Sequence, residues 1–345
     1  MDEDAILRTT KYIDQYIDQG RNRTVTNSGI DKKVIPYIKK YVGKVRDIYE
    51  LEDYVILIAT DRQSAFDRML TSIPYKGQVL NLTSKWWFDS TKEIVPNHVI
   101  ACPHPNVTIG KKCKVFPIEF VMRGYITGTT STSIWTHYKN GVRNYCGHEL
   151  PDGMEKNMKL PKFILTPTTK DEHDVPLSIN EIISSGRMSA ADVQICSDYA
   201  HKLFNFSVKE AEKRGMILVD TKYEFGKDQD DKIVLIDEIQ TPDSSRYWIA
   251  KSYTSHMMQG LEPENIDKEF LRKWYIEQCD PYNDEIIPEA PIHLVNELSR
   301  RYIMLYEIIT GNKFDFLHNT GKKNIQTAIK DWLEHKNDCF QCMIL

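Results

Sequence analysis

The first third of the chain has mainly the hydrophobic pattern of β-strands. The continuous apolar run Tyr54–Ala59 predicts a buried strand, and Val115–Met122 predicts a second strand in which Pro117 marks an edge or a bend. Residues 79–88 follow helical spacing and predict a helix on the same sheet. Residues 6–17 predict a short helix before these strands, with a polar connector after it.

Helical and strand patterns alternate later in the chain. Helical spacing predicts three helices, over residues 189–214, 292–309 and 325–335. Ser189, with Asp192 three residues on, predicts the start of the first helix, and Gly215 predicts its end. Two apolar runs, residues 216–225 and 232–238, flank a polar turn and predict a β-hairpin. A strand-rich lobe followed by a mixed lobe predicts an α+β protein with a cleft between the lobes.

Composition narrows the class of protein. The 345 residues include 45 Lys and Arg and 49 Asp and Glu, a net charge of −4, which argues against coating nucleic acid or an anionic membrane. The acidic N-terminus does not resemble a signal peptide, and no apolar run is long enough to span a membrane. Seven scattered cysteines predict reduced thiols, and we regard the prenylation-like C-terminal box at Cys342 as accidental. We expect a cytoplasmic protein.

The hairpin carries the most informative polar pattern. Asp220, Lys222 and Glu224 alternate along one strand and therefore share a face. If the turn is centred on residues 230–231, Glu224 lies opposite Asp237, with Cβ atoms about 4.5–5.5 Å apart. Two carboxylates at that distance need a proton or a cation between them, and such oxygen donors suit Mg²⁺ with nucleotide phosphates. The alternative is a solvated hairpin face, but the flanking apolar residues favour the metal.

Three loops add groups that could hold an anionic ligand, at residues 43–47, 123–133 and 168–174. The first offers Lys44 and Arg46 beside a glycine, and Arg246 follows the hairpin directly. Each loop alone is more often an ordinary solvated loop. Taken together, basic groups, metal-capable acids and hydroxyl loops without a nucleophile motif favour phosphoryl transfer.

Five motifs occur in an order that resembles the phosphoribosylaminoimidazole-succinocarboxamide synthase (SAICAR synthase) family, at residues 43–49, 59–67, 121–128, 220–226 and 237–248. The resemblance implies a two-lobed fold with ATP in the cleft. It also implies an ATP-dependent ligase of de novo purine (IMP) biosynthesis. Such an enzyme joins L-aspartate to the carboxylate of carboxyaminoimidazole ribonucleotide (CAIR) through an acyl phosphate, giving SAICAR, ADP and phosphate. The expected cofactors are therefore ATP and Mg²⁺.

The resemblance implies a role for each residue that matches a family motif. The residues that would contact ATP are Lys44, Arg46, Lys170, Glu119 and Val121, the last two through backbone groups. The Mg²⁺ positions are Glu224 and Asp237, and the reacting centre is lined by Asp220 and Lys222. The residues expected to bind the substrates are Arg123, Ser133, Asp174 and Arg246, with Ser131 the alternative to Ser133.

The same resemblance suggests how the chain is divided. We expect an N-terminal helical extension and connector over residues 1–34 and a strand-rich nucleotide-binding lobe over residues 35–121. Residues 122–345 would form a mixed α/β lobe with the substrate and Mg²⁺ site and the C-terminal helices. We expect small-molecule partners, no nucleic acid and no membrane, with a homo-oligomer left open. The rival functions are a kinase, which the absence of H-R-D and D-F-G motifs disfavours, and a nucleotide-binding regulator without turnover.

Overall fold

The computed structural model describes residues 13–14, 16–66, 68–171, 174–266, 268–316 and 322–341. The chain forms two compact units. The first unit comprises Met1–Trp86, Val99–Lys112 and Asp267–Leu345, and the second comprises Trp87–His98 and Cys113–Ile266. The boundaries expected at residues 34 and 121 stay predictions, although the C-terminal segment here groups with the first unit and not with the second. Cys342 and the expected helical residues 6–12 lie outside the described residues.

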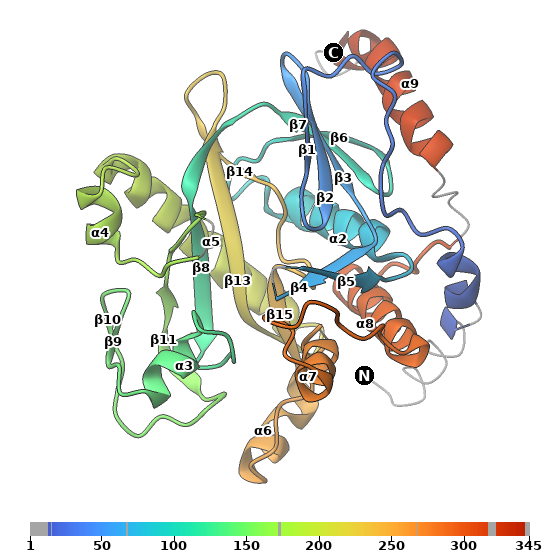
Figure 1. Ribbon diagram of the computed structural model, residues 1–345. Coiled ribbons are helices and arrows are strands. Elements are labelled where there is room, and N and C mark those ends of the chain that lie inside the picture. The colour runs from blue at the N-terminus through green and yellow to red at the C-terminus, as the bar shows by residue number, and fades with distance from the viewer. Residues whose placement is uncertain are drawn as a thin grey trace. The chain divides into compact units, whose positions relative to one another are not determined.

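The first unit contains an antiparallel sheet in the order β1-β2-β3-β7-β6 (Figure 1). Its strands are β1 (Lys39–Val42), β2 (Arg46–Glu50), β3 (Tyr54–Ala59), β6 (Val99–His104) and β7 (Val107–Lys111). A separate ribbon consists of β4 (Arg62–Ala65) and β5 (Arg68–Ser72). The strand predicted over Tyr54–Ala59 is confirmed as β3, in which residues 56–59 are buried. Because successive residues of a strand point to opposite faces, β3 is covered on both faces along this stretch.

Helices α7 (Glu269–Gln278), α8 (Ile292–Thr310) and α9 (Lys322–Gln341) belong to the first unit, and α2 (Lys76–Thr91) contributes residues to both units. The predicted helices at 79–88, 292–309 and 325–335 are thereby confirmed. Helix α8 packs against Ile13 and Ile17 of the N-terminal segment, where residues 13–14 and 16–21 are helical. Helix α9 places Ile325 and Ile329 in a second cluster with side chains of β2, β3 and β7.

The second unit contains an antiparallel sheet in the order β11-β8-β13-β14, with β12 beside β8 and β15 beside β13. Its strands are β8 (Lys114–Tyr125), β11 (Lys159–Leu165), β12 (Thr168–Thr169), β13 (Met216–Lys227), β14 (Ile233–Ile236) and β15 (Ser245–Ile249). A short hairpin adds β9 (Asn144–Tyr145) and β10 (His148–Glu149). The helices of this unit are α3 (Ile134–Lys139), α4 (Ile179–Ser184), α5 (Ala190–Glu212) and α6 (Ala250–Met258).

Helix α5 covers one face of this sheet and confirms the helix predicted at 189–214. The Ser189 side chain accepts a hydrogen bond from the Asp192 backbone N–H, as an N-cap does. Aromatic rings pack at this contact: the ring centroids of Tyr199 in α5 and Phe225 in β13 are 6.2 Å apart. Because alternate strand residues point to opposite faces, the residues next to Phe225 point away from α5.

Two expectations about the sheets need revision. The strands that we expected in one sheet, Tyr54–Ala59 and Val115–Met122, lie in different sheets: the first is β3 of the first unit's sheet, and the second is part of β8 in the second unit's sheet. The strand containing Pro117 is not an edge strand, since β8 has neighbours on both sides. Its predicted bend is present: the pairing of β8 with β13 shifts register between Glu119 and Val115, and Pro117 lies in this irregular stretch.

Candidate active site

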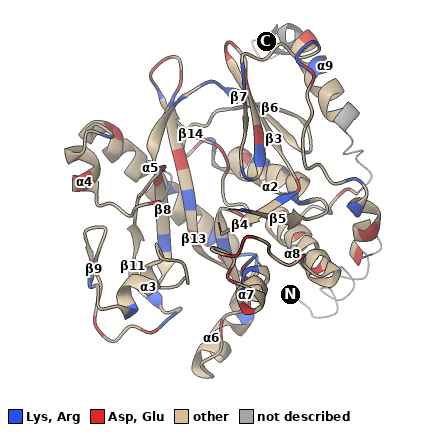
Figure 2. Ribbon diagram, viewed as in Figure 1, with Lys and Arg blue, Asp and Glu red and all other residues tan. Residues whose placement is uncertain are grey.

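Charged side chains gather on the face of the second unit's sheet that points away from α5. Residues directly opposite each other in an antiparallel pair share a face, and the register pairs Glu119 with Glu224, Val121 with Lys222, and Arg123 with Asp220. On the other edge of β13, Arg246 lies opposite Asp220. We call the six charged residues of this set the polar face. Figure 2 shows the alternation of acidic and basic positions along β13. The shared face predicted for Asp220, Lys222 and Glu224 is confirmed.

Lys222 is held between two carboxylates at one end of the polar face. Its Nζ donates to Glu119 Oε1 at 2.6 Å and to Glu224 Oε1 at 2.7 Å. A second ammonium, that of Lys170 just beyond β12, forms an ion pair with the other oxygen of Glu224. The Glu224 side chain is only 9% exposed, so its charge is balanced mainly by these two lysines.

The pKa shifts of this cluster follow from its charges. Burial alone would lower the pKa of Lys222, but the carboxylates of Glu224, Glu119 and Asp237 raise it well above its ordinary value. Burial opposes ionisation of Glu224, yet the Lys222 and Lys170 ammoniums lower its pKa to about 2. Burial and the nearby Glu224 raise the pKa of Glu119 although Lys222 opposes the shift. Lys222 and Glu224 are therefore charged at neutral pH.

Two arginines converge on Asp220 at the other end of the polar face. Arg246 Nη1 donates to Asp220 Oδ2, and Arg123 Nη1 lies 3.6 Å from the same oxygen. Arg123 Nε also donates to Thr166 Oγ1 at 2.8 Å, which fixes the plane of its guanidinium. Two cations share one carboxylate here, so this end of the face has an excess of positive charge that suits a phosphate or carboxylate ligand.

Ser133 lies close to this arginine pair. It precedes α3 and is 2% exposed, and its Oγ donates to Thr130 O at 2.7 Å. Gly128 has a φ of +102°, and a Cβ at this position would lie 2.5 Å from the Ser133 Cβ and 3.5 Å from Arg246 Nη2. Glycine is thus required where Ser133 and Arg246 meet the loop. Ser131, the alternative ligand, is exposed.

The predicted direct pairing of Glu224 with Asp237 is wrong. The turn spans residues 228–232, so Glu224 lies opposite Ile236 and Asp237 follows the end of β14. Asp237 has a φ of +64°, a left-handed conformation that interrupts the strand. Its carboxylate nevertheless acts on Lys222, whose pKa it raises. Glu224 and Asp237 therefore act electrostatically on one ammonium without being cross-strand partners.

The donor chemistry of Glu224 and Asp237 fits Mg²⁺, which prefers carboxylate oxygens and retains positions for phosphate or water. Among the residues that the structure describes, no group of three or more His, Cys, Asp or Glu side chains could hold a metal by itself. The two carboxylates would thus need oxygen donors from a nucleotide or from water to complete the coordination of the ion.

The remaining expected ligands are placed as follows. The backbone of Val121 is already engaged, since its carbonyl accepts a hydrogen bond from Thr166 N at 2.8 Å, and Glu119 pairs with Thr168 of β12. Asp174 is exposed, and its charge raises the pKa of Glu119. Lys44 and Arg46 belong to the first unit, in and just after the loop between β1 and β2.

Two sets of contacts have no counterpart among the residues expected from the sequence. Thr166 orients Arg123, and its only sequence signal is its place just before the hydroxyl-rich segment at 168–169. In the first unit, Arg62 forms a buried ion pair with Asp47 at 2.8 Å. Its signal is the charged pair Asp61-Arg62 immediately after the apolar strand at 54–59, within a family motif to which no role is attached.

Comparisons with known proteins agree on one family. A family model described as SAICAR synthetase matches residues 39–288. The phosphoribosylaminoimidazole-succinocarboxamide synthase of Legionella pneumophila (strain Paris) is 58% identical over 302 residues, covering 87% of this chain and 97% of that protein. The chloroplastic enzyme of the same name from Arabidopsis thaliana is 60% identical over 303 residues, covering 86% of this chain and 74% of that protein.

Solved structures give the same result. The SAICAR-synthase from Saccharomyces cerevisiae, complexed with SAICAR, has a TM-score of 0.70 at 30% identity and covers 85% of this chain and 100% of that chain. A SAICAR synthetase in complex with ADP has a TM-score of 0.61 at 25% identity, covering 80% of this chain and 100% of that chain. The family and the α+β fold expected from the motifs are confirmed: the chain belongs to the SAICAR synthetase family.

Proposed function

We propose that the polar face of the second unit carries the reaction of this family. The chain is an ATP-dependent ligase of purine biosynthesis that joins L-aspartate to CAIR. The single observation that supports this placement is the position of the Lys222 ammonium. It lies 2.6 Å from the carboxylate of Glu119 and 2.7 Å from that of Glu224, and two arginines pair with Asp220 at the other end of the same face. Such a surface provides adjacent places for a polyphosphate with its cation and for an anionic ribonucleotide.

The chemistry explains why these residue types are needed. A carboxylate resists attack by an amine because oxide would have to leave. Transfer of the γ-phosphoryl group of ATP to the CAIR carboxylate creates an acyl phosphate, from which phosphate can leave when the aspartate amine attacks. The protein's own contribution is to position the reactants and to stabilise negative charge, which is the work of fixed cations and not of a nucleophilic side chain.

Each cluster takes one part of this work. Arg123, Arg246 and Ser133 bind the ribonucleotide, because both guanidiniums meet at Asp220 and can form paired hydrogen bonds to a phosphate. Lys222 and Asp220 line the reacting centre. Lys170, Lys44 and Arg46 contact ATP, and Asp174 helps to place the ligands. Glu224 and Asp237 would hold Mg²⁺, which would neutralise the phosphate oxygens when it is bound.

ADP release with CAIR and L-aspartate each omitted in turn tests the reaction against its rivals. We expect full release only with both substrates present, since each is consumed in every turnover. A kinase would release ADP with a single acceptor, and a nucleotide-binding regulator would release none under any condition. Either pattern would contradict the ligase.

Replacing Ser133 by Ala should raise the KM for CAIR about tenfold, the loss expected for one hydrogen bond to a charged ligand. Ser131→Ala is the matched control, because Ser131 is exposed whereas Ser133 is buried beside Arg246. Steady-state kinetics with CAIR as the varied substrate measure both variants. Equal losses in the two variants would contradict the assignment of the contact to Ser133.

Within the described residues, no helix combines the length and the hydrophobicity that crossing a bilayer demands. Cys102, Cys113, Cys146, Cys196 and Cys279 are free thiols. We therefore retain the cytoplasm, a reducing compartment, as the proposed location. The expectation of small-molecule partners without nucleic acid belongs to the same proposal, and self-association stays a prediction.

A further inference from the structure

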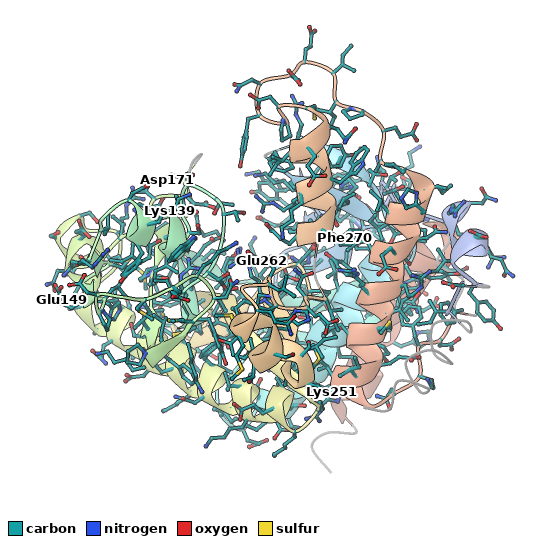
Figure 3. The ribbon with its side chains drawn as sticks, turned by 90° about the horizontal axis from the view of Figure 1, so that it is seen from below. Lys139, Glu149, Asp171, Lys251, Glu262 and Phe270 are labelled. Atoms are coloured by element: carbon teal, nitrogen blue, oxygen red, sulfur yellow. The ribbon has the colours of Figure 1, made fainter. Side chains whose placement is uncertain are left out.

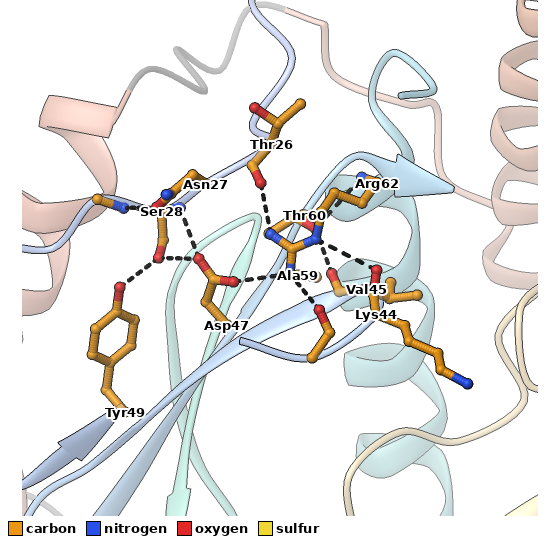
Figure 4. Close-up of polar contacts among 12 residues, drawn as sticks. Thr26, Asn27, Ser28, Lys44, Val45, Asp47, Tyr49, Ala59, Thr60 and Arg62 are labelled. Carbon is orange, nitrogen blue, oxygen red and sulfur yellow. Dashed lines mark hydrogen bonds and ion pairs between the residues drawn. The ribbon is translucent and has the colours of Figure 1, made fainter. Parts of the chain in front are cut away.

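A buried arginine of the first unit binds the main chain of the β1–β2 loop. Arg62 is 7% exposed, and its guanidinium donates to Thr26 O at 2.6 Å and to Gly43 O at 2.9 Å (Figure 4). Its Nε donates to Lys44 O at 3.4 Å, and the same guanidinium is paired with Asp47. One side chain thus connects the N-terminal connector, two carbonyls of the loop and the second residue of β2.

The acidic partner of Arg62 is itself held in place. Asp47 is fully buried, and its Oδ2 accepts hydrogen bonds from Ser28 N at 2.9 Å and Ser28 Oγ at 2.5 Å. Burial opposes ionisation, but the hydrogen bonds from Ser28 and Arg62 keep the pKa of Asp47 below its ordinary value. Tyr49 in turn contacts the Ser28 hydroxyl at 2.7 Å. The ion pair is therefore a fixed anchor and not a mobile surface contact.

The anchor determines which way the loop faces. Gly43 N donates to Arg46 O at 2.8 Å, which closes the hairpin. Val45 O accepts hydrogen bonds from Thr60 N at 2.9 Å and from Thr60 Oγ1 at 2.5 Å. The carbonyls of Gly43, Lys44 and Val45 are thus all engaged by Arg62 or Thr60. Lys44 is exposed, and in Figure 4 its side chain points away from the Arg62 guanidinium.

We propose that Arg62 is a positioning residue for the nucleotide: it fixes the loop so that Lys44 and Arg46 are presented to the triphosphate before ATP arrives. The inference rests on the proposed role of Lys44 and Arg46 in binding ATP phosphates. A loop ordered in advance loses little conformational freedom on binding, whereas a free loop must be ordered by the ligand itself. Arginine suits this position because its five N–H donors lie in one rigid plane and serve four separate acceptors here, one more than the three donors of a lysine could serve.

The Arg62→Lys variant tests the role, since lysine keeps the charge opposite Asp47 but cannot reach the loop carbonyls together. We expect the KM for ATP to rise about tenfold or more, with the KM for CAIR changed less than twofold. Arg301→Lys is the matched control, because Arg301 also pairs with a carboxylate of the first unit but lies on α8. Thr60→Val is a milder second probe that removes the hydroxyl's bond to Val45 O and the long bond that it accepts from Arg62 N at 3.4 Å, and it should raise the KM for ATP about threefold.

A double-variant cycle with Lys44→Ala separates this inference from the proposed function. If Arg62 acts through Lys44, Arg62→Lys should raise the KM for ATP much less in the Lys44→Ala background than in the wild-type chain. Additive effects, or equal losses in every kinetic constant, would overturn the positioning role. A normal KM for ATP in Lys44→Ala itself would contradict the nucleotide role of the loop. A raised KM in Lys44→Ala with normal values in both Arg62→Lys and Thr60→Val would overturn only the inference.

Discussion

In the Glu224→Gln variant we expect kcat to fall by about a thousandfold while the chain keeps its fold. The amide has nearly the shape of the carboxylate but no charge. The Lys170 and Lys222 ammoniums then lose the anion that places them, and one of the two carboxylates proposed for Mg²⁺ is gone. Misplaced charges raise the free energy of the transition state of phosphoryl transfer more than they destabilise the folded chain.

The measurement is kcat at saturating ATP, CAIR and L-aspartate, with circular dichroism to check the fold. Glu149→Gln is the control, because Glu149 of β10 is an exposed glutamate of the same unit and lies at its periphery in Figure 3. The control should retain normal kcat. A well-folded Glu224→Gln variant with near-normal turnover would refute the role of this carboxylate.

Replacing Lys222 by Met should lower kcat by about a hundredfold or more and also destabilise the chain. Without its ammonium, the carboxylates of Glu119 and Glu224 face each other in a partly buried place. Removing one partner of a buried ion pair costs about 3–5 kcal/mol of unfolding free energy, and we expect the lower end because the Lys222 side chain keeps 30% exposure. Urea unfolding and steady-state kinetics measure the two effects.

A second substitution distinguishes structure from catalysis at Lys222. Adding Glu119→Gln to Lys222→Met removes one of the opposed charges, so the double variant should regain much of the lost stability. Its turnover should stay low, because the cation of the proposed reacting centre is still missing. If activity returned along with stability, Lys222 would be a structural residue only.

The hairpin shows which features could be predicted from the sequence. Alternation is a local property, so the two strands and the common face of Asp220, Lys222 and Glu224 follow from the residues alone. The register depends on the number of residues in the turn, and a slip of one residue changes every partner. The observed turn places Ile236 opposite Glu224, and the left-handed Asp237 breaks a pattern that looked continuous.

The features that could not be predicted depend on contacts between distant segments. Glu119 and Lys222 are 103 residues apart, and only the pairing of β8 with β13 brings the two charges together. Arg62 and Thr26 are 36 residues apart, and the charged pair Asp61-Arg62 after the apolar strand does not indicate which main-chain carbonyls the arginine binds. The five motifs could identify the family, but a motif states which residues recur and not which atoms meet.

The hydrophobic clusters of the first unit extend beyond the stretch that the family model matches, residues 39–288. Ile13 and Ile17 share one cluster with α8, and Ile325 and Ile329 of α9 close over another. An excised fragment limited to the matched stretch would leave both clusters open to water and would therefore tend to aggregate. The segment that the family model matches and the segment that closes these hydrophobic clusters are thus different lengths of the same polypeptide.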